Sequence, residues 1–325
     1  MTAQWGLLST ARINDAFLAG VAEARESTVL AVASRDRARG ERYAAARGIP
    51  RAYHSYEALL ADPDIDAVYI SLPNSMHLEW TRRALEAGKH VLCEKPLSRR
   101  TADVAAAFDL AEREGRLLME AFMYRHHPQT ARLADLVHSG AIGRVRMVRA
   151  AFSFNATDPA DVRLSAALDG GSLMDVGCYC VSAARLLAGE PELVSGAQVI
   201  GGEGVDVAFT GWMRFADDVL AHFDSGLVCD DRFDLEVVGD EASLYVPDPW
   251  HCVTPRIELR RAHAIEIITI PEANAYGLEA DNLAAAIGGD GSPLLGRADA
   301  TGQARAIEAL YASADSGAPV RPPRR

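Results

Sequence analysis

The sequence lacks the features that mark several classes of protein. Its 325 residues include only five cysteines and no CxxC pair, so it has neither a disulfide framework nor the paired cysteines of a zinc site. Its formal net charge of −12 leaves no basic excess for a nucleic acid or an anionic membrane. No apolar run reaches transmembrane length, and no charged leader precedes the first predicted strand. We therefore expect a soluble, reduced, cytoplasmic protein that binds no metal, nucleic acid or membrane.

The glycine-rich turn G-x-G-x-x-G of dinucleotide-binding domains is also missing. The first predicted strand covers residues 4–8, and the three fingerprint positions after it hold Ser9, Ala11 and Asn14. Serine and alanine are the smallest replacements for glycine, and the backbone N–H groups of a following helix still form an anion site. The alternative is a helix start that binds nothing. The candidate pyrophosphate contacts are Ser9, Thr10, Ala11, Arg12 and Ile13.

Strands and helices nevertheless alternate through the first third of the chain. Continuous apolar or β-branched runs predict strands at residues 4–8, 28–33, 67–72, 89–94 and 116–119. Helices are predicted at residues 13–24, 37–47, 56–61, 76–87 and 101–114. This alternation is typical of a doubly wound parallel sheet with right-handed crossovers. We expect an N-terminal Rossmann domain over residues 1–122.

The pattern changes after residue 122. A helix at 128–139, a strand at 145–154 and a helix at 170–188 precede seven further extended runs between residues 194 and 270. Many of these runs alternate apolar with polar residues, which indicates an antiparallel sheet with one open face. Two helices, at 278–287 and 298–314, follow and are free to pack back on the first domain. We therefore expect an α+β domain over residues 123–325, with a large, mostly antiparallel, open-faced sheet.

The end of the second predicted strand bears on cofactor choice. NAD-binding domains usually place an acidic residue there to hold the ribose 2′-hydroxyl, but this strand ends at Ser34 and Arg35. An arginine suits a 2′-phosphate, because guanidinium makes charge-assisted hydrogen bonds to it. Asp36 is the contrary observation, since its side chain is able to turn inward, and the alternative for Arg35 is a solvated surface residue. We expect NADP(H) in preference to NAD(H).

Polar residues also follow the next strands, where doubly wound sheets bind their ligands. Leu72, Pro73 and Asn74 end the 67–72 strand, and the Asn74 amide is suited to a ribose or a nicotinamide carboxamide. His77 begins the next helix and has two interpretations, a cofactor contact or a contact with its own helix terminus. Glu94 and Lys95 end the fourth strand, where an ammonium group is placed to contact a ligand oxygen.

The second domain contributes the segment Gly170-Gly171-Ser172-Leu173-Met174-Asp175-Val176-Gly177-Cys178-Tyr179. Asp175 and Tyr179 are four residues apart, so on a helix they share a face. The paired glycines allow a backbone or a ligand to approach the helix start. Taken alone, these residues are better explained as a core tyrosine and a first-turn aspartate, whereas a position facing Lys95 across a cleft favours a functional role.

Together these segments resemble the Gfo/Idh/MocA oxidoreductases, relatives of glucose–fructose oxidoreductase and inositol dehydrogenase. The resemblance is carried by WGLLSTARI, LPNSMH, EKP, YRHHPQ and GGSLMDVGCY and spans nearly the whole chain. It implies that Lys95 is the catalytic lysine, that Asp175 orients the substrate, and that Tyr124 and Arg125 contact it. Many members carry histidine where this chain has Tyr179, so the chain resembles the tyrosine-bearing branch of dihydrodiol and NADP-dependent xylose dehydrogenases. His126 stands where an aromatic residue is common.

The resemblance implies hydride transfer between nicotinamide and a carbinol carbon of a sugar-like substrate. Tyr179 then acts as acid/base, Lys95 polarises the oxygen and Asp175 orients the substrate. A trans-dihydrodiol dehydrogenase and a nucleotide-sugar ketoreductase remain as alternative enzymes. An NADPH-binding sensor without turnover and a partner-binding protein remain as non-enzymatic alternatives. The resemblance also implies a homodimer or homotetramer assembled through the C-terminal sheet.

Overall fold

The computed structural model describes residues 2–323 of the chain, so residues 1, 324 and 325 of the predicted domain bounds lie outside it. The described residues form two compact units. Within residues 2–323, the first contains residues 2–98, 102–126 and 274–301, and the second contains residues 99–101, 127–273 and 302–323. Each unit is therefore built from segments that are far apart in the sequence, because a late segment returns to the first unit.

The first unit contains a six-stranded parallel sheet. Its strands are β1 (Ala3–Leu8), β2 (Ser27–Ala33), β3 (Arg51–Tyr53), β4 (Ala67–Ile70), β5 (His90–Glu94) and β6 (Leu118–Ala121). Their order is β3-β2-β1-β4-β5-β6, so the chain reverses direction across the sheet between β1 and β4. This is the predicted Rossmann topology, which is thereby confirmed. The three-residue strand β3 was not predicted, and β6 lies two residues later than expected.

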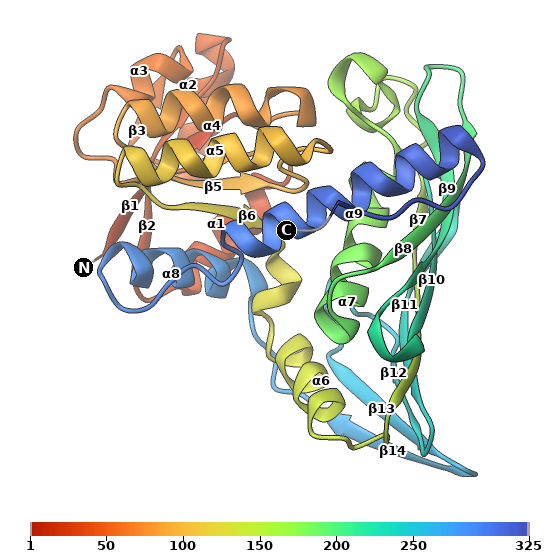
Figure 1. The fold of residues 1–325 in the computed structure, drawn as a ribbon. Helices are drawn as coiled ribbons and strands as arrows, with labels where there is room; N and C mark the ends of the chain where they lie inside the picture. The colour runs from red at the N-terminus through yellow and green to blue at the C-terminus, as the bar shows by residue number, and fades with distance from the viewer. Residues whose placement is uncertain (1, 324–325) are drawn as a thin grey trace. The chain divides into compact units, whose positions relative to one another are not determined.

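Helices cover both faces of this sheet (Figure 1). They are α1 (Asn14–Glu23), α2 (Arg37–Arg47), α3 (Tyr56–Leu60), α4 (His77–Glu86), α5 (Thr101–Arg113) and α8 (Ala275–Ile287), with short 3-10 turns η1 (Asn74–Met76) and η2 (Met123–His126). Figure 1 shows α4 and α5 on one face and α1 with α8 on the other. Gly20 of α1 and Gly277 of α8 meet backbone to backbone, where a Cβ at Gly20 would lie 2.4 Å from the Gly277 nitrogen. This close crossing explains why α8 belongs to the first unit.

The second unit contains an eight-stranded sheet. Its strands are β7 (Val145–Asn155), β8 (Leu193–Ile200), β9 (Asp206–Arg214), β10 (Leu220–Gly226), β11 (Val228–Gly239), β12 (Ser243–Val246), β13 (Arg256–Arg261) and β14 (Ala264–Thr269). Their order is β14-β13-β12-β11-β7-β10-β9-β8. Every neighbouring pair is antiparallel except β10 and β7, which are parallel. The predicted mostly antiparallel sheet is therefore confirmed.

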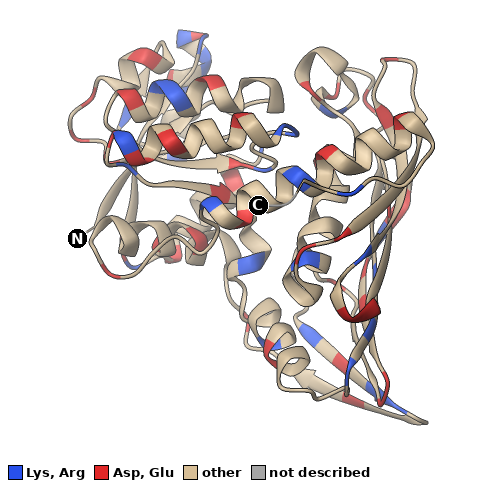
Figure 2. Cartoon of the chain, in the orientation of Figure 1, with Lys and Arg blue, Asp and Glu red and all other residues tan. Residues whose placement is uncertain are grey.

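Among the described residues of the second unit, helices lie along one face of this sheet (Figure 1). They are α6 (Pro128–His138), α7 (Cys178–Ala188) and the part of α9 (Arg297–Ser316) from Gly302 onward. Phe209 and Phe223 stack on the covered face, and Phe209 packs edge-on against Tyr311 of α9. The strands of this sheet contain both acidic and basic residues (Figure 2). None of the described helices combines the length and apolar character needed to cross a bilayer.

Candidate functional site

The turn after β1 has the backbone geometry of a glycine turn without the glycine. Ser9 has φ of +149°, a region that glycine adopts far more readily than serine. Its hydroxyl lies 2.8 Å from the Ser71 hydroxyl beyond β4, and its carbonyl accepts a 2.9 Å hydrogen bond from the buried Asn14 amide. Two of the three predicted fingerprint positions therefore hold the turn in place through side-chain hydrogen bonds.

This turn fits the pyrophosphate of a dinucleotide. The Ala11 N–H is used internally, because it donates to the Ser9 hydroxyl at 3.0 Å. Within residues 2–323, the N–H groups of Thr10, Arg12 and Ile13 donate to no other residue. Open N–H groups at the start of α1 form a ready anion site with the positive end of the helix dipole.

The end of β2 resolves the two interpretations of Asp36. The Asp36 carboxylate is the N-cap of α2, since it accepts a 3.0 Å hydrogen bond from the Arg39 N–H, while the Asp36 N–H donates to Ser34. A carboxylate engaged in capping is not turned toward a ribose 2′-hydroxyl. Asp36 therefore no longer argues against a preference for NADP(H).

Two arginines flank this strand end. Arg35 is the second residue after β2, and Arg39 lies in the first turn of α2, where its guanidinium donates to the Thr10 carbonyl at 3.3 Å. Both lie close enough to Tyr56 to lower its pKa, although burial has the larger effect and raises it. Both arginines are exposed. Sequence analysis missed Arg39, because Arg35 lies outside α2 and no helical spacing relates the two arginines.

His77 links the loops after β4 and β5. It is completely buried, and its two ring nitrogens lie 2.8 Å from the Leu72 carbonyl oxygen and 2.9 Å from the Pro96 carbonyl oxygen. These contacts hold together the two loops that carry Asn74 and Lys95. The sequence left His77 as either a cofactor contact or a contact with its own helix terminus. The geometry favours a structural residue that holds the two loops in place.

Glu94 and Lys95 end β5 as expected. Glu94 accepts a short hydrogen bond from the Tyr69 hydroxyl, and its second oxygen accepts a 3.3 Å hydrogen bond from the Lys95 N–H. The pKa of Tyr69 lies well above its ordinary value, because the ring is fully buried and faces the Glu94 carboxylate. Glu94 is thus anchored on the buried side of the strand end, and Lys95 is half-buried beside it.

Lysine is scarce in this chain, a signal that our sequence analysis did not use. The sequence contains only two lysines, Lys89 and Lys95. Lys89 is buried, and its ammonium group donates to the backbone carbonyls of Asp62 and Ile65 at 2.6 and 2.8 Å. Lys89 therefore has a structural role, which leaves Lys95 as the one lysine at a candidate site.

Tyr124 and Arg125, the predicted substrate contacts after β6, are largely engaged within the protein. Tyr124 is 1 % exposed, and Arg125 is ion-paired with Asp299 at 3.4 Å. The structure places both within the first unit. Their contact with substrate stays a prediction that rests on the family resemblance.

A buried acidic group lies in the same region. Glu279 of α8 is completely buried, and neither carboxyl oxygen has a hydrogen-bond partner among the described residues. Its Oε1 lies 3.9 Å from His126 Nδ1, whose pKa is lowered to about 4, chiefly by burial. Burial and the nearby Glu94 raise the pKa of Glu279 well above its ordinary value, and the pKa of Tyr276 is raised by burial and by both carboxyls. The fold therefore favours the protonated form of Glu279 over the ionised form.

In the second unit, other parts of the protein, rather than a ligand, lie close to the paired glycines Gly170 and Gly171. A Cβ at Gly170 would lie 2.2 Å from the Arg163 carbonyl oxygen, and one at Gly171 would lie 2.2 Å from the Asp206 carboxylate. Asp206 accepts hydrogen bonds from the Ser172 hydroxyl and the Leu173 N–H at 2.8 and 2.7 Å. The glycines thus fix the start of the segment that carries Asp175.

The predicted single helix over 170–188 is wrong in its first part. Gly171 has φ of +121°, which excludes it from a helix, and residues Leu173–Gly177 form a π-helical turn (η5) before α7 begins at Cys178. A π turn winds more widely than an α-helix and is frequent at functional sites. Asp175 lies in this turn and Tyr179 in the first turn of α7.

Asp175 and Tyr179 are held by different neighbours. Asp175 Oδ2 accepts a 2.8 Å hydrogen bond from Arg163 Nε, a partner that the sequence analysis did not identify. The Tyr179 ring packs edge-on against Phe152 and Trp250, with centroid distances of 5.3 and 5.9 Å. Lys95 belongs to the first unit and Asp175 with Tyr179 to the second, so their action on one oxygen stays a prediction.

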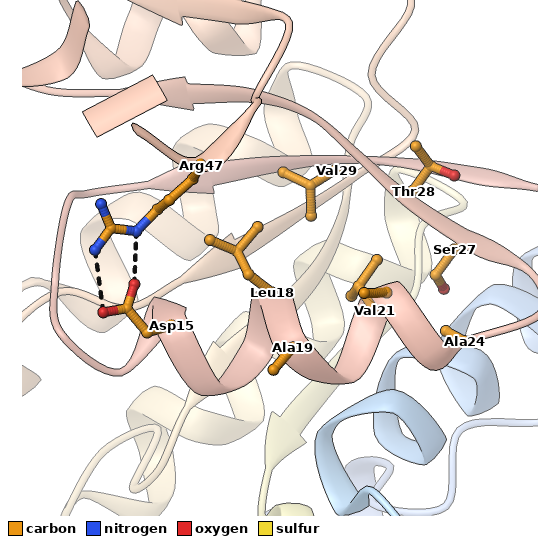
Figure 3. A pocket seen from close by; sticks show the side chains of 10 residues that line it. Asp15, Leu18, Ala19, Val21, Ala24, Ser27, Thr28, Val29 and Arg47 are labelled. Atoms are coloured by element: carbon orange, nitrogen blue, oxygen red, sulfur yellow. Dashed lines mark hydrogen bonds and ion pairs between the residues drawn. The ribbon is translucent and has the colours of Figure 1, made fainter. Parts of the chain in front are cut away.

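A surface hollow of about 590 Å³ lies elsewhere in the first unit (Figure 3). It is lined by α1 and by the first residues of β2, including Leu18, Val21 and Val29, with the Asp15–Arg47 ion pair at one end. Ser27 and Thr28 begin β2, whereas Ser34 follows its end. The hollow is therefore not formed at the carboxyl ends of the strands, where the predicted cofactor contacts lie.

Comparison with known proteins identifies two family matches. Residues 5–122 match the GFO_IDH_MocA description "Oxidoreductase family, NAD-binding Rossmann fold". Residues 130–245 match the description "GFO/IDH/MocA C-terminal domain". The two matches correspond to the parallel sheet of the first unit and to much of the large sheet of the second.

The individual relatives named here cover between 78% and 97% of the chain. D-xylose 1-dehydrogenase (NADP(+)) 2 of Haloferax volcanii is 40% identical over 97% of this chain and 98% of its own length. A dTDP-3,4-didehydro-2,6-dideoxy-alpha-D-glucose 3-reductase of Saccharopolyspora spinosa is 37% identical over 78% of each chain. The crystal structure of KijD10, a 3-ketoreductase from Actinomadura kijaniata in complex with NADP and TDP-benzene, superposes with a TM-score of 0.91. It covers 96% of this chain and 98% of that chain at 29% identity.

Proposed function

We propose, because this chain belongs to the Gfo/Idh/MocA oxidoreductase family, that it transfers a hydride between NADP(H) and the carbinol carbon of a sugar-like substrate. The observation that carries the proposal is the 40% identity to an NADP-dependent D-xylose dehydrogenase over 97% of the chain. The chain also keeps Lys95, Asp175 and Tyr179 at the positions that the family resemblance assigns to catalysis.

The preference for NADP(H) rests on the end of β2. Arg35 and Arg39 supply two guanidinium groups beyond the end of β2, where dinucleotide-binding domains hold the adenosine ribose, and Asp36 is engaged as a helix cap. Guanidinium hydrogen-bonds phosphate in a bidentate manner, so two of them favour the phosphorylated cofactor. The Ser9–Ile13 turn supports the pyrophosphate with its open N–H groups.

The chemistry assigned to the protein is proton transfer and orientation, since the bound nicotinamide supplies or accepts the hydride. Tyr179 exchanges a proton with the substrate oxygen as the carbon–hydrogen bond breaks or forms. The Lys95 ammonium group donates a hydrogen bond to the same oxygen and stabilises the charge that develops there. Asp175 accepts a hydrogen bond from a neighbouring hydroxyl and so fixes which carbon reacts. Glu94 and His77 hold the Lys95 loop from behind.

The test uses Lys95→Met and Tyr179→Phe. We expect each change to lower kcat by at least about 100-fold, in line with loss of a general acid/base or an oxyanion donor. NADPH binding, measured by fluorescence, should stay within a few-fold of the wild type. Tyr43→Phe is the matched control, because the Tyr43 hydroxyl lies 3.4 Å from Asp15 at the hollow beside α1, away from the predicted cofactor and substrate contacts. Turnover close to wild type in both site variants would refute the assignment.

A substrate panel separates the related activities. D-xylose and other free aldoses, a trans-dihydrodiol and a nucleotide-linked keto sugar are offered to the same sample with NADP⁺ or NADPH. We expect the free aldoses to be turned over most efficiently. Binding of NADPH without hydride transfer to any of these substrates would indicate a sensor.

We propose further that the open face of the eight-stranded sheet joins two copies of the chain. Neighbouring strands align one continuous outward row across this face, namely Trp212, His222, Arg149, Glu236, Tyr245, Glu258 and Ile267. Trp212 is 39% exposed, and Val199, Leu220 and Ile265 are also exposed. Large exposed apolar residues on one open sheet are typical of protein contacts. Sedimentation equilibrium should therefore give a mass above that of one chain.

A further inference from the structure

Arg163 lies between two carboxylates in the second unit. Its Nε donates to Asp175 at 2.8 Å, and its Nη1 lies 3.2 Å from both oxygens of Asp161. The guanidinium carbon also lies 5.5 Å from the centroid of the Phe154 ring. A planar group held from three sides has little freedom to rotate, so Arg163 presents one fixed orientation to Asp175.

Asp161 fixes Arg163 through the backbone as well. The Asp161 carboxylate accepts a 3.0 Å hydrogen bond from the Arg163 N–H and so caps the 3-10 turn η3 (Val162–Leu164). The Arg163 carbonyl accepts a 2.9 Å hydrogen bond from the Gly171 N–H at the start of the Asp175 segment. Side chain and backbone of Arg163 therefore both contact the segment that leads into η5.

We propose that Arg163 is a positioning residue that orients the Asp175 carboxylate toward the substrate and thereby sets affinity for polyhydroxylated substrates. The inference rests on the proposed function, because it assigns to Asp175 the role of substrate orienter. One oxygen of Asp175 is directed to Arg163, which fixes the direction of the other. A misplacement of about 1 Å in an orienting group is enough to cost on the order of 100-fold in rate.

The electrostatics agree with this role. Asp175 is the largest cause of the raised pKa of Arg163, ahead of the opposing effect of burial and of the contribution from Asp161. By the same interaction, the guanidinium favours the ionised form of Asp175. An ionised carboxylate accepts hydrogen bonds at both oxygens, whereas a protonated one presents a donor that the substrate hydroxyl does not require.

The alternative role for Arg163 is a purely structural ion pair. Arg83 of α4 provides a matched control. Its guanidinium spans Glu57 and Glu79 at 2.7 and 2.8 Å and lies 4.7 Å from the centroid of the Trp80 ring. Its side chain is 37% exposed, against 35% for Arg163. Arg83 has no part in the proposed chemistry.

The experiment compares Arg163→Met, Arg163→Lys and Arg83→Met in the full chain. For Arg163→Met we expect KM for the best aldose to rise about tenfold or more, with a smaller fall in kcat and unchanged NADPH affinity. The acid limb of the kcat/KM profile should move to higher pH, because the carboxylate loses its cation. Arg163→Lys should restore the acid limb but only part of KM, since lysine keeps the charge without the fork.

Three outcomes decide the inference. Equal losses of thermal stability in the two methionine variants, with a raised KM in Arg163→Met alone, support positioning. A KM and pH profile in Arg163→Met that match those of Arg83→Met overturn it, whatever the change in stability. Absence of turnover in the wild-type chain with every substrate of the panel is a failure of the proposed function, and it is seen before any variant is made.

Discussion

The basis of NADP(H) preference is directly testable at the end of β2. The change is the double substitution Arg35→Ser and Arg39→Met, which removes both guanidinium groups and leaves the Asp36 cap in place. The cap depends on the Arg39 backbone N–H, which both substitutions retain. Helix α2 should therefore stay folded, and the effect should fall on cofactor binding.

The magnitude follows from the chemistry of the contact. A hydrogen bond to a charged group contributes about 1.5 to 3 kcal/mol, and each 1.4 kcal/mol is about tenfold in affinity. Arg35 and Arg39 are exposed, so solvent screening favours the lower end of this range. We therefore expect each arginine to contribute about tenfold, and their joint loss to weaken NADPH binding about 100-fold. NADH lacks the 2′-phosphate, so its affinity should change less than about threefold.

Fluorescence titration with NADPH and NADH measures both affinities on one sample. Arg37→Met is the control, because Arg37 lies on the same helix but is 78% exposed and paired with Glu41. In the wild type, raising the ionic strength should weaken NADPH binding more than NADH binding. Parallel losses for the two cofactors in the double variant, or none for either, would refute the assignment of the 2′-phosphate site.

Two further predictions concern stability and assembly. The carboxyl of Glu279 has an ordinary pKa of 4.5, which the fold raises, so between these values the folded chain holds a proton that the unfolded chain releases. The contribution of this carboxyl to folding stability is present at low pH and is lost as the pH rises. The melting temperature of Glu279→Gln should therefore exceed that of the wild type by more at pH 8 than at pH 5. A difference independent of pH would contradict a buried neutral acid. Trp212→Glu should convert the oligomer to monomers in sedimentation, because it places a charge in the row that we assign to the contact, and an unchanged mass would move the contact elsewhere.

The fold was largely predictable because the buried strands of a parallel sheet consist of continuous apolar residues, which can be recognised in the sequence. The strands β1, β2, β4 and β5 were each found within about two residues at either end. Strand β3 was missed, because the segment Arg51–Tyr53 is a three-residue edge strand without an apolar run. The return of α8 to the first unit was left open, since helix periodicity records a buried face but not the surface that covers it.

The site was predictable where position along a strand carries the information and unpredictable where side-chain geometry does. Lys95 and Asn74 each follow the end of a strand, and that position can be read from the sequence once the strand is recognised. The role of Asp36 depended on whether its carboxylate caps α2 or faces the ribose, a choice that coordinates decide. Arg163 lies twelve residues before Asp175 in a segment of short turns, so no periodicity relates the two. The π turn that carries Asp175 likewise leaves no distinct pattern in the sequence.

The use of lysine gives an independent argument about the candidate catalytic group. The chain has 31 arginines and two lysines, so nearly every cation is a guanidinium. At Lys89 the exception has a visible cause, because a compact ammonium group fits between the carbonyls of Asp62 and Ile65 in a buried space, and burial lowers its pKa. An ammonium group is a point charge whose proton can be tuned by its surroundings, whereas guanidinium is broad and permanently charged. The only other position that keeps lysine is 95, where the proposed reaction needs a small cation to approach one oxygen beside a tyrosine. A chain that uses arginine almost everywhere therefore retains lysine where the geometry of the donor, rather than its charge alone, is required.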